Sequence, residues 1–181
     1  MDVHHRVGIL TTALLFGFAV AVGPALSEGD PRPTPPAPST DTKSGSGGKS
    51  TKSKKKQKQS EQKFLDGYTQ AYNLIQAGRY ADGIAAMHAL GHDEHPDVAN
   101  YIGYASRKLG NYEDAKYWYE KALAADPNHV RTYQYFAMWY LEQGNRLKAQ
   151  DYLVTIRTLC GGTACKEYVS LQDALNGNMI Y

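Results

Sequence analysis

A 34-residue period constrains the fold of this chain more than any other feature of its sequence. Small or apolar positions of residues 96–129 recur one period later. The pairs are Gly110 and Gly144, Ala115 and Ala149, Tyr119 and Leu153, and Ala122 and Ile156. A fixed period of this length is typical of arrays in which each repeat buries its apolar face against its neighbours. We therefore expect residues 64–160 to fold as stacked repeats.

Residues 96–129 predict two helices that pack against each other. Gly103 and Ala115 lack bulk, so the two helices can approach closely, and Tyr119 fills the space that they leave. Gly110 can take the left-handed conformation that ends a helix. Pro127 fits at a helix boundary because it cannot donate a backbone hydrogen bond. The first helix carries Val98, Ala99, Ile102, Gly103 and Ala105, and the second carries Ala115, Tyr119, Ala122 and Leu123.

This unit resembles the tetratricopeptide repeat family. The agreement is at Gly103, Gly110, Tyr112, Ala115, Tyr119, Ala122 and Pro127. The unit departs from the family at Ala99, Ile102 and Ser106, where Trp, Leu and Tyr are usual, and Tyr140 restores that Tyr one repeat later. The resemblance implies an all-α, right-handed solenoid of helical hairpins with about three repeats, over residues 64–95, 96–129 and 130–160. The first of these is degenerate, although Gly78-Arg79-Tyr80 repeats the Gly110-Asn111-Tyr112 turn.

The domain is expected to span residues 61–181 and to end in a capping helix. A helix over residues 166–176 would place Tyr168, Leu171, Ala174 and Leu175 on one face. A solenoid needs such a helix because its last apolar face must be covered.

Residues 1–27 read as a secretory signal peptide. A weakly basic start at His4, His5 and Arg6 precedes an apolar run over residues 7–22. Small residues favour cleavage after Ala25 or after Ser27. The run is shorter than the roughly 20 residues that span a bilayer, so an uncleaved anchor is the less favoured alternative. The sequence predicts an exported protein, periplasmic or secreted.

Residues 28–60 are predicted to be a disordered linker, because they hold almost no large apolar side chain to bury. Residues 1–60 carry nine Lys and Arg against four Asp and Glu, whereas residues 61–181 carry eleven against fourteen. The domain itself is therefore acidic, which argues against a nucleic-acid partner. The linker is either a solvated spacer or a contact with anionic lipid or acidic polymer. That contact would use Lys49, Lys52, Lys54, Lys55, Lys56 and Lys58.

Cys160 and Cys165 are the two cysteines of the chain and flank Gly161-Gly162-Thr163-Ala164. An oxidising compartment favours a disulfide between them, and the glycines let the backbone bring them together. A redox pair or part of a metal site is the alternative, but the spacing is not that of a CxxC motif.

The sequence offers no pattern that indicates catalysis. His88, His92 and His95 gather near Asp93 and Glu94, in a stretch that Gly91 and Pro96 mark as a turn. We interpret it as a solvated turn rather than a metal site, which needs fixed geometry. HExxH, GxSxG and a phosphate-binding glycine loop are missing. We expect a protein that is not an enzyme and needs no cofactor or metal.

The family resemblance implies that the first helix of each repeat lines a concave groove that binds a protein or peptide. Tyrosine suits recognition because it combines a wide apolar ring with a polar tip, and arginine donates to carboxylates. Some of these tyrosines are expected to pack between repeats instead. A carboxylate clamp is not expected, because tyrosines replace polar residues that it needs. The groove residues would be Tyr68, Tyr72, Asn100, Tyr101, Tyr104, Arg107, Lys108, Arg131, Gln134, Tyr135 and Met138.

Two hypotheses of function follow. In the first, the protein is an exported scaffold or adaptor that holds an extended peptide or a helix of an envelope partner. In the alternative, it is a structural or surface-attachment protein whose Lys-rich linker makes the contact.

Overall fold

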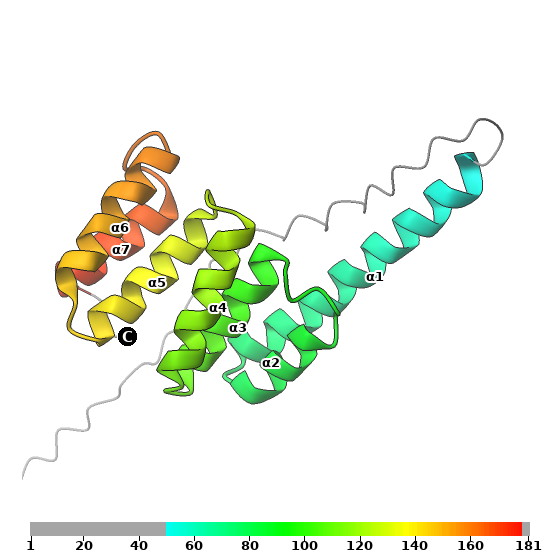
Figure 1. Cartoon of the computed structure of the whole chain (residues 1–181), viewed down its shortest axis with the longest axis horizontal. Helices are drawn as coiled ribbons and strands as arrows, with labels where there is room; N and C mark the ends of the chain where they lie inside the picture. Colours follow the sequence, from blue (N-terminus) through cyan, green and yellow to red (C-terminus); the bar gives the residue numbers. More distant parts are fainter. Residues whose placement is uncertain (1–49, 179–181) are drawn as a thin grey trace, which may run out of the picture. The chain divides into compact units, whose positions relative to one another are not determined.

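The computed structural model describes residues 50–178, and within that range all regular secondary structure is helical. The predicted signal peptide and the first part of the predicted linker lie outside the described residues. None of the described helices is long and apolar enough to cross a membrane. The helices in Figure 1 are α1 (Ser50–Gln76), α2 (Tyr80–His88), α3 (Pro96–Lys108), α4 (Tyr112–Ala125), α5 (Val130–Glu142), α6 (Arg146–Leu159) and α7 (Lys166–Leu175).

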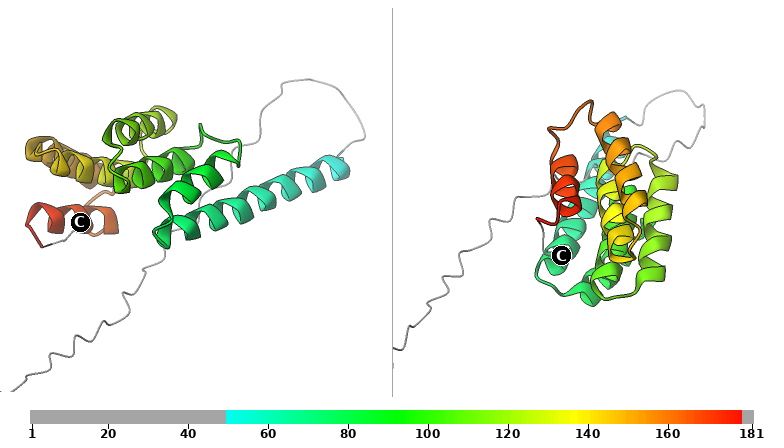
Figure 2. Two further views of the ribbon diagram at one scale, coloured as in Figure 1. Left: turned by 90° about the horizontal axis from the view of Figure 1, so that it is seen from below. Right: turned by 90° about the vertical axis from the view of Figure 1, so that its left-hand side faces the viewer.

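The first six helices form three consecutive hairpins. Helices α1 and α2, α3 and α4, and α5 and α6 pack in pairs, and successive pairs contact each other through α2 with α3 and α4 with α5. The first helices of the pairs also meet, α1 with α3 and α3 with α5 (Figure 2). The predicted helical-hairpin solenoid is confirmed.

One turn is repeated inside each hairpin. Gly78, Gly110 and Gly144 have φ angles of 76°, 80° and 76°, the left-handed region that glycine enters without strain. The residue after each glycine donates its backbone N–H to a carbonyl five residues earlier, as Asn111 does to Ser106 at 2.9 Å. This is the Schellman arrangement, which satisfies a carbonyl left unpaired at the helix end. The helix end predicted at Gly110 is confirmed.

Close packing within the second hairpin depends on Gly103. A β-carbon added there would lie 2.9 Å from ring carbons of Tyr119 and 3.2 Å from the carbonyl oxygen of Ala115. Tyr119 and Ala115 are fully buried. The small residues therefore let α3 and α4 approach each other around the tyrosine ring, as predicted.

Helix α7 covers the last hairpin by packing on both α5 and α6. Its buried face carries Leu171, Ala174 and Leu175, and the Arg146 guanidinium donates to the Leu175 carbonyl. Just before α7 the sulfur atoms of Cys160 and Cys165 lie at disulfide distance, with the two α-carbons 6.2 Å apart. The bridge therefore closes the connection from α6 to α7.

Residues 50–60 differ from the disorder predicted for residues 28–60, because they form the first turns of α1. Lys and Gln are good helix formers, and Ser50–Gln76 contains a single Gly and no Pro. The turns are also continuous with the part of α1 that carries Phe64, Tyr68 and Ile75 into the core. Tertiary packing of that part stabilises a helix that a polar segment alone would not form.

Candidate partner-binding surface

Tyrosines from three successive repeats meet in one cluster on α1, α3 and α5. The ring of Tyr101 lies 6.0 Å from that of Tyr68, 5.3 Å from Tyr72 and 6.3 Å from Tyr135. Tyr104 lies 4.9 Å from Tyr135. Most of these contacts are edge-to-face, the arrangement that aromatic quadrupoles favour. The first helices of the hairpins are thus joined by a continuous aromatic contact, which we call the tyrosine cluster.

The tyrosine cluster has a buried part and an accessible part. Tyr68 and Tyr101 are 3% and 1% exposed, so they are core residues. Tyr72, Tyr104 and Tyr135 are half-buried and pack at the edge of that core. Tyr80, from the start of α2, joins them at 6.4 Å from Tyr104. The accessible part therefore presents aromatic surface from three hairpins side by side.

Two cations border the tyrosine cluster at the end of α3. Arg107 is buried, stacks at 5.6 Å on Tyr104, and donates to Glu142 at 2.8 Å. Burial alone would lower the pKa of Arg107, but Tyr119 and Glu142 outweigh it and raise the pKa. Lys108 is half-buried with its ammonium 5.8 Å from the Tyr104 ring, and burial and Arg107 lower its pKa. Lys108 is thus the cation that a partner can reach, whereas Arg107 is held by its ion pair.

Asn100 and Arg131 were predicted to face a ligand, but the structure buries both. Asn100 is 0% exposed and its side-chain oxygen accepts from Thr132 at 3.1 Å. Arg131 is 8% exposed and donates to the Asp97 carboxylate at 2.9 Å. These side chains join α3 to α5 instead of lining an open groove, because each finds a polar partner on the neighbouring helix.

Asp97 is the centre of this buried polar contact. Its carboxylate lies 3.2 Å from Nε2 of His129 in addition to the bond from Arg131. Burial raises the pKa of Asp97, but the hydrogen bond and charge of His129 and the charge of Arg131 outweigh it. The pKa of Asp97 is therefore held below its ordinary value of 3.8.

Gln134 and Met138 also lie elsewhere than predicted. Met138 is buried in the core that α5 shares with α7, next to Leu171 and Leu175. Gln134 donates to the Ser170 hydroxyl at 2.8 Å. Helix α7 packs on α5, and these two side chains face it, so they anchor the cap. Of the predicted groove residues, Tyr72, Tyr104, Lys108 and Tyr135 therefore form the accessible surface, which Tyr80 joins.

The comparison with known families agrees with this architecture. A family model described as a tetratricopeptide repeat matches residues 96–129. Residues 96–129 are a tetratricopeptide repeat. The match coincides with the hairpin of α3 and α4 and the connection to α5.

Solved structures share the fold of this chain. The translocator chaperone SycD of Yersinia enterocolitica is 19% identical with a TM-score of 0.59, over 73% of this chain and 99% of that one. SycD with a peptide of the translocator YopD is 21% identical, with a TM-score of 0.52, over 62% and 86%. PcrH in complex with the chaperone binding region of PopB is 22% identical, with a TM-score of 0.53, over 65% and 95%. At these identities the likeness shows the fold. No curated protein matches the sequence.

The histidines at the end of α2 and in the loop before α3 are each held by a neighbouring group. His88 lies 2.9 Å from Asp93, and His92 lies 3.4 Å from Glu94. His95 is buried and accepts from the Asp97 backbone N–H at 3.2 Å, so it caps α3. Among the described residues, one group of three close metal-ligand atoms occurs, Cys160, Cys165 and Glu167, and its sulfurs form the disulfide.

Sequence reasoning missed Tyr80 as a member of the accessible surface. It is the residue of the Gly78-Arg79-Tyr80 turn that corresponds to Tyr112 one repeat later. That equivalence assigns a place at the start of the second helix, but contact with α3 depends on how the hairpins stack. The structure shows the contact, because Tyr80 packs against the first core cluster beside Tyr104.

Proposed function

We propose that this protein is an exported interaction module that holds an extended peptide or a helix of an envelope partner, as a scaffold or adaptor. The observation that carries the proposal is the accessible part of the tyrosine cluster, Tyr72, Tyr104 and Tyr135, on three successive first helices. The half-buried rings are held by their neighbours, so little side-chain entropy is lost when a partner covers them.

The chemistry of this surface favours a peptide over a small substrate. Rigid aromatic rings next to one cation, Lys108, are typical of protein-recognition surfaces, where aromatic residues dominate the binding energy. The structural neighbours support the same class of ligand, since SycD is described with a peptide of YopD and PcrH with the binding regions of PopB and PopD. We propose a role without catalysis.

Export is part of the proposal. It rests on the signal-peptide pattern of residues 1–27. The paired Cys160 and Cys165 support it, because structural disulfides persist in oxidising compartments. N-terminal sequencing of protein from the periplasm or medium tests it: a start after Ala25 or Ser27 is expected, and an intact Met1 in the membrane fraction would refute cleavage.

Affinity capture from an envelope extract tests the binding site. The full chain is compared with a Tyr104→Ala/Tyr135→Ala variant and with Tyr117→Ala, a tyrosine on α4 that is 57% exposed and outside the tyrosine cluster. Proteins captured by the wild type and Tyr117→Ala should be lost with the double variant. Equal capture by all three proteins would contradict the site. Circular dichroism of each variant checks that helicity is retained.

A second candidate function is attachment to anionic polymer or lipid through the lysine-rich segment. The observation that favours it is that Lys54, Lys55, Lys56 and Lys58 are all exposed on the first turns of α1. Each lysine near an anionic membrane contributes about 1 kcal/mol. Changing these four residues to Gln should then release the full chain from phosphatidylserine vesicles, while unchanged envelope fractionation of the variant would remove this candidate.

A further inference from the structure

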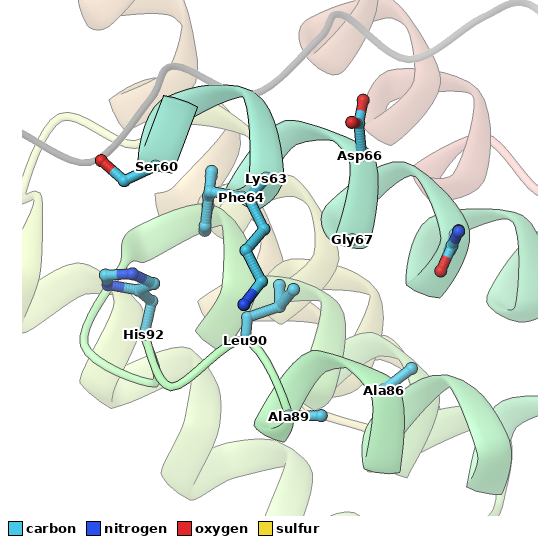
Figure 3. Close-up of a pocket in the computed structure, with 10 residues that line it drawn as sticks. Ser60, Lys63, Phe64, Asp66, Gly67, Ala86, Ala89, Leu90 and His92 are labelled. Atoms are coloured by element: carbon cyan, nitrogen blue, oxygen red, sulfur yellow. The ribbon is translucent and has the colours of Figure 1, made fainter. Parts of the chain in front are cut away.

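The first hairpin holds a cleft of 580 Å³ that takes no part in the tyrosine cluster. Every lining residue belongs to α1, to the end of α2 or to the loop that follows, whereas the tyrosine cluster spans three hairpins (Figure 3). The volume lies within the 300–1,000 Å³ typical of sites for small molecules. The cleft is therefore large enough for a ligand of its own.

The inner wall of the cleft is apolar and tightly fixed. Phe64, Ala86 and Leu90 line it, and Phe64 and Leu90 are part of the first core cluster. Gly67 lets α1 approach Leu90, because a β-carbon there would lie 2.7 Å from its Cδ2 atom. The ring of His92 stands edge-on to Phe64 with centroids 5.2 Å apart. A ligand seated here would thus bury apolar surface against side chains that are already packed.

The rim of the cleft carries positive charge. Lys63 runs from α1 across the opening toward Leu90 in Figure 3. The Ser60 hydroxyl, one turn earlier, donates to the Gln57 carbonyl at 2.7 Å. Lys56 is exposed two turns before Lys63, on the same face of the helix. Asp66 is the acidic residue of the lining, but its carboxylate accepts from Gln62 at 2.8 Å and points away from α2. The charge that reaches across the opening is therefore the positive charge of Lys63.

The carbonyl end of α2 also faces this region and would by itself disfavour an anion. Capping bonds reduce that effect, since Leu90 and Gly91 donate their N–H groups to the carbonyls of Met87 and His88 at 3.1 and 3.0 Å. The full charge of Lys63 at the opening outweighs the partial charges that remain.

We propose that this cleft binds an anionic amphiphile of the long-chain carboxylate class. The alkyl chain lies along Phe64, Ala86 and Leu90, and the carboxylate sits at the rim, where the Lys63 ammonium donates to it. The two halves of the ligand match the two halves of the cleft, an apolar wall with a cationic mouth. A polyanion without an apolar part would gain no binding free energy from the apolar wall. A neutral alkane would gain none from the charge of Lys63.

Fluorescence titration of the full chain with dansylaminoundecanoate tests the site, and the methyl ester of the probe serves as its uncharged counterpart. Saturable binding of the acid is expected, about threefold tighter than that of the ester, the ratio that an exposed ion pair supplies. Lys63→Gln should remove the preference for the acid and leave ester binding unchanged. Lys116→Gln, on α4, is the charge-matched control and should keep the preference.

Filling the cleft is the complementary test. Ala86→Phe should weaken binding of both probes at least tenfold, whereas Ala85→Phe, which is exposed on α2 and does not line the cleft, should leave it unchanged. No saturable binding, equal affinity for acid and ester in the wild type, or full binding by Ala86→Phe would each overturn the proposal. Loss of binding on Tyr104→Ala would also overturn it, because the probe would then occupy the tyrosine cluster. The Lys63→Gln result stands even if Ala86→Phe folds poorly, since Lys63 is exposed.

Discussion

Helix α3 shares aromatic contacts with both of its neighbouring first helices, but a buried polar contact is added on one side. Toward α1 the contact is aromatic, with Tyr101 between Tyr68 and Tyr72. Toward α5 the rings continue to Tyr135. That side also holds polar bonds, from Asp97 to Arg131 and His129 and from Asn100 to Thr132. Apolar contact is non-directional and tolerates small shifts, whereas buried polar groups lose much when one partner is removed. The difference indicates that the α3–α5 contact fixes the register of the repeats and that the α1–α3 contact mainly fills space.

The largest expected effect comes from removing the centre of the polar contact. Asp97→Ala leaves the buried Arg131 and the half-buried His129 without their carboxylate, which should lower the free energy of unfolding by about 3–5 kcal/mol. Urea unfolding followed by circular dichroism measures it. Asp151→Ala, an exposed carboxylate on α6, is the control and should cost less than about 1 kcal/mol. Similar losses in the two variants would mean that the α3–α5 contact is no more critical than a surface ion pair.

Acid should break the polar contact selectively. The pKa of Asp97 is lower in the folded protein than its ordinary 3.8, so this carboxylate stabilises the fold above that value and the stabilisation is lost as the pH falls through the folded pKa. Asp97→Asn lacks this group, so its stability should fall less over the same range. Urea unfolding of both proteins between neutral pH and pH about 2.5 measures the difference between their free energies of unfolding. A difference that stays constant with pH would contradict the lowered pKa of Asp97.

A smaller loss is expected when the Thr132 hydroxyl is removed from the polar contact. Thr132→Val keeps the shape of the side chain but leaves the buried Asn100 oxygen without the donor that lies 3.1 Å away, and it also removes the contact of 2.6 Å with Nδ1 of His129. The free energy of unfolding should fall by about 1–3 kcal/mol. Thr155→Val, whose hydroxyl bonds to a carbonyl of its own helix near the surface, is the matched control and should change it by less than about 0.5 kcal/mol.

The aromatic contact should show the smallest effect when a polar atom is removed from it. Within the part of the chain that the structure describes, the Tyr101 hydroxyl is buried and has no hydrogen-bond partner. Tyr101→Phe keeps the ring contacts, so the free energy of unfolding should change by less than about 0.5 kcal/mol or rise slightly. A loss above about 1 kcal/mol in urea unfolding would show that this hydroxyl is bonded and that the two contacts of α3 are alike.

The sequence predicted the hairpins but only part of the candidate site. The 34-residue period is a property of local packing, such as Gly103 against Tyr119, and it is visible in one repeat and its successor. Accessibility depends on what stacks against each first helix. Met138 was assigned to a groove because its position faces the groove in the family, but α7 covers it here.

One contact that was not predicted, the ion pair of Asp97 and Arg131, is nevertheless indicated by the sequence. Asp97 and Arg131 are 34 residues apart, so they occupy the same position in successive repeats. Opposite charges at one repeat position predict an ion pair between neighbouring first helices, since stacked repeats place equivalent positions side by side. Arg107 and Glu142, at a separation of 35, follow nearly the same rule. By this rule Arg131 is a structural residue that pairs with Asp97, whereas Lys108 remains a residue of the accessible surface.

The position of α7 has a consequence for the length of any ligand. By packing on α5 it ends the row of accessible first helices at three, α1, α3 and α5. Neighbouring helix axes lie about 8–10 Å apart, so the row is two such intervals wide, or roughly 18 Å. An extended chain advances about 3.3 Å per residue. A strand-like ligand laid across the tyrosines would therefore be read over about six residues, the length of a short linear motif.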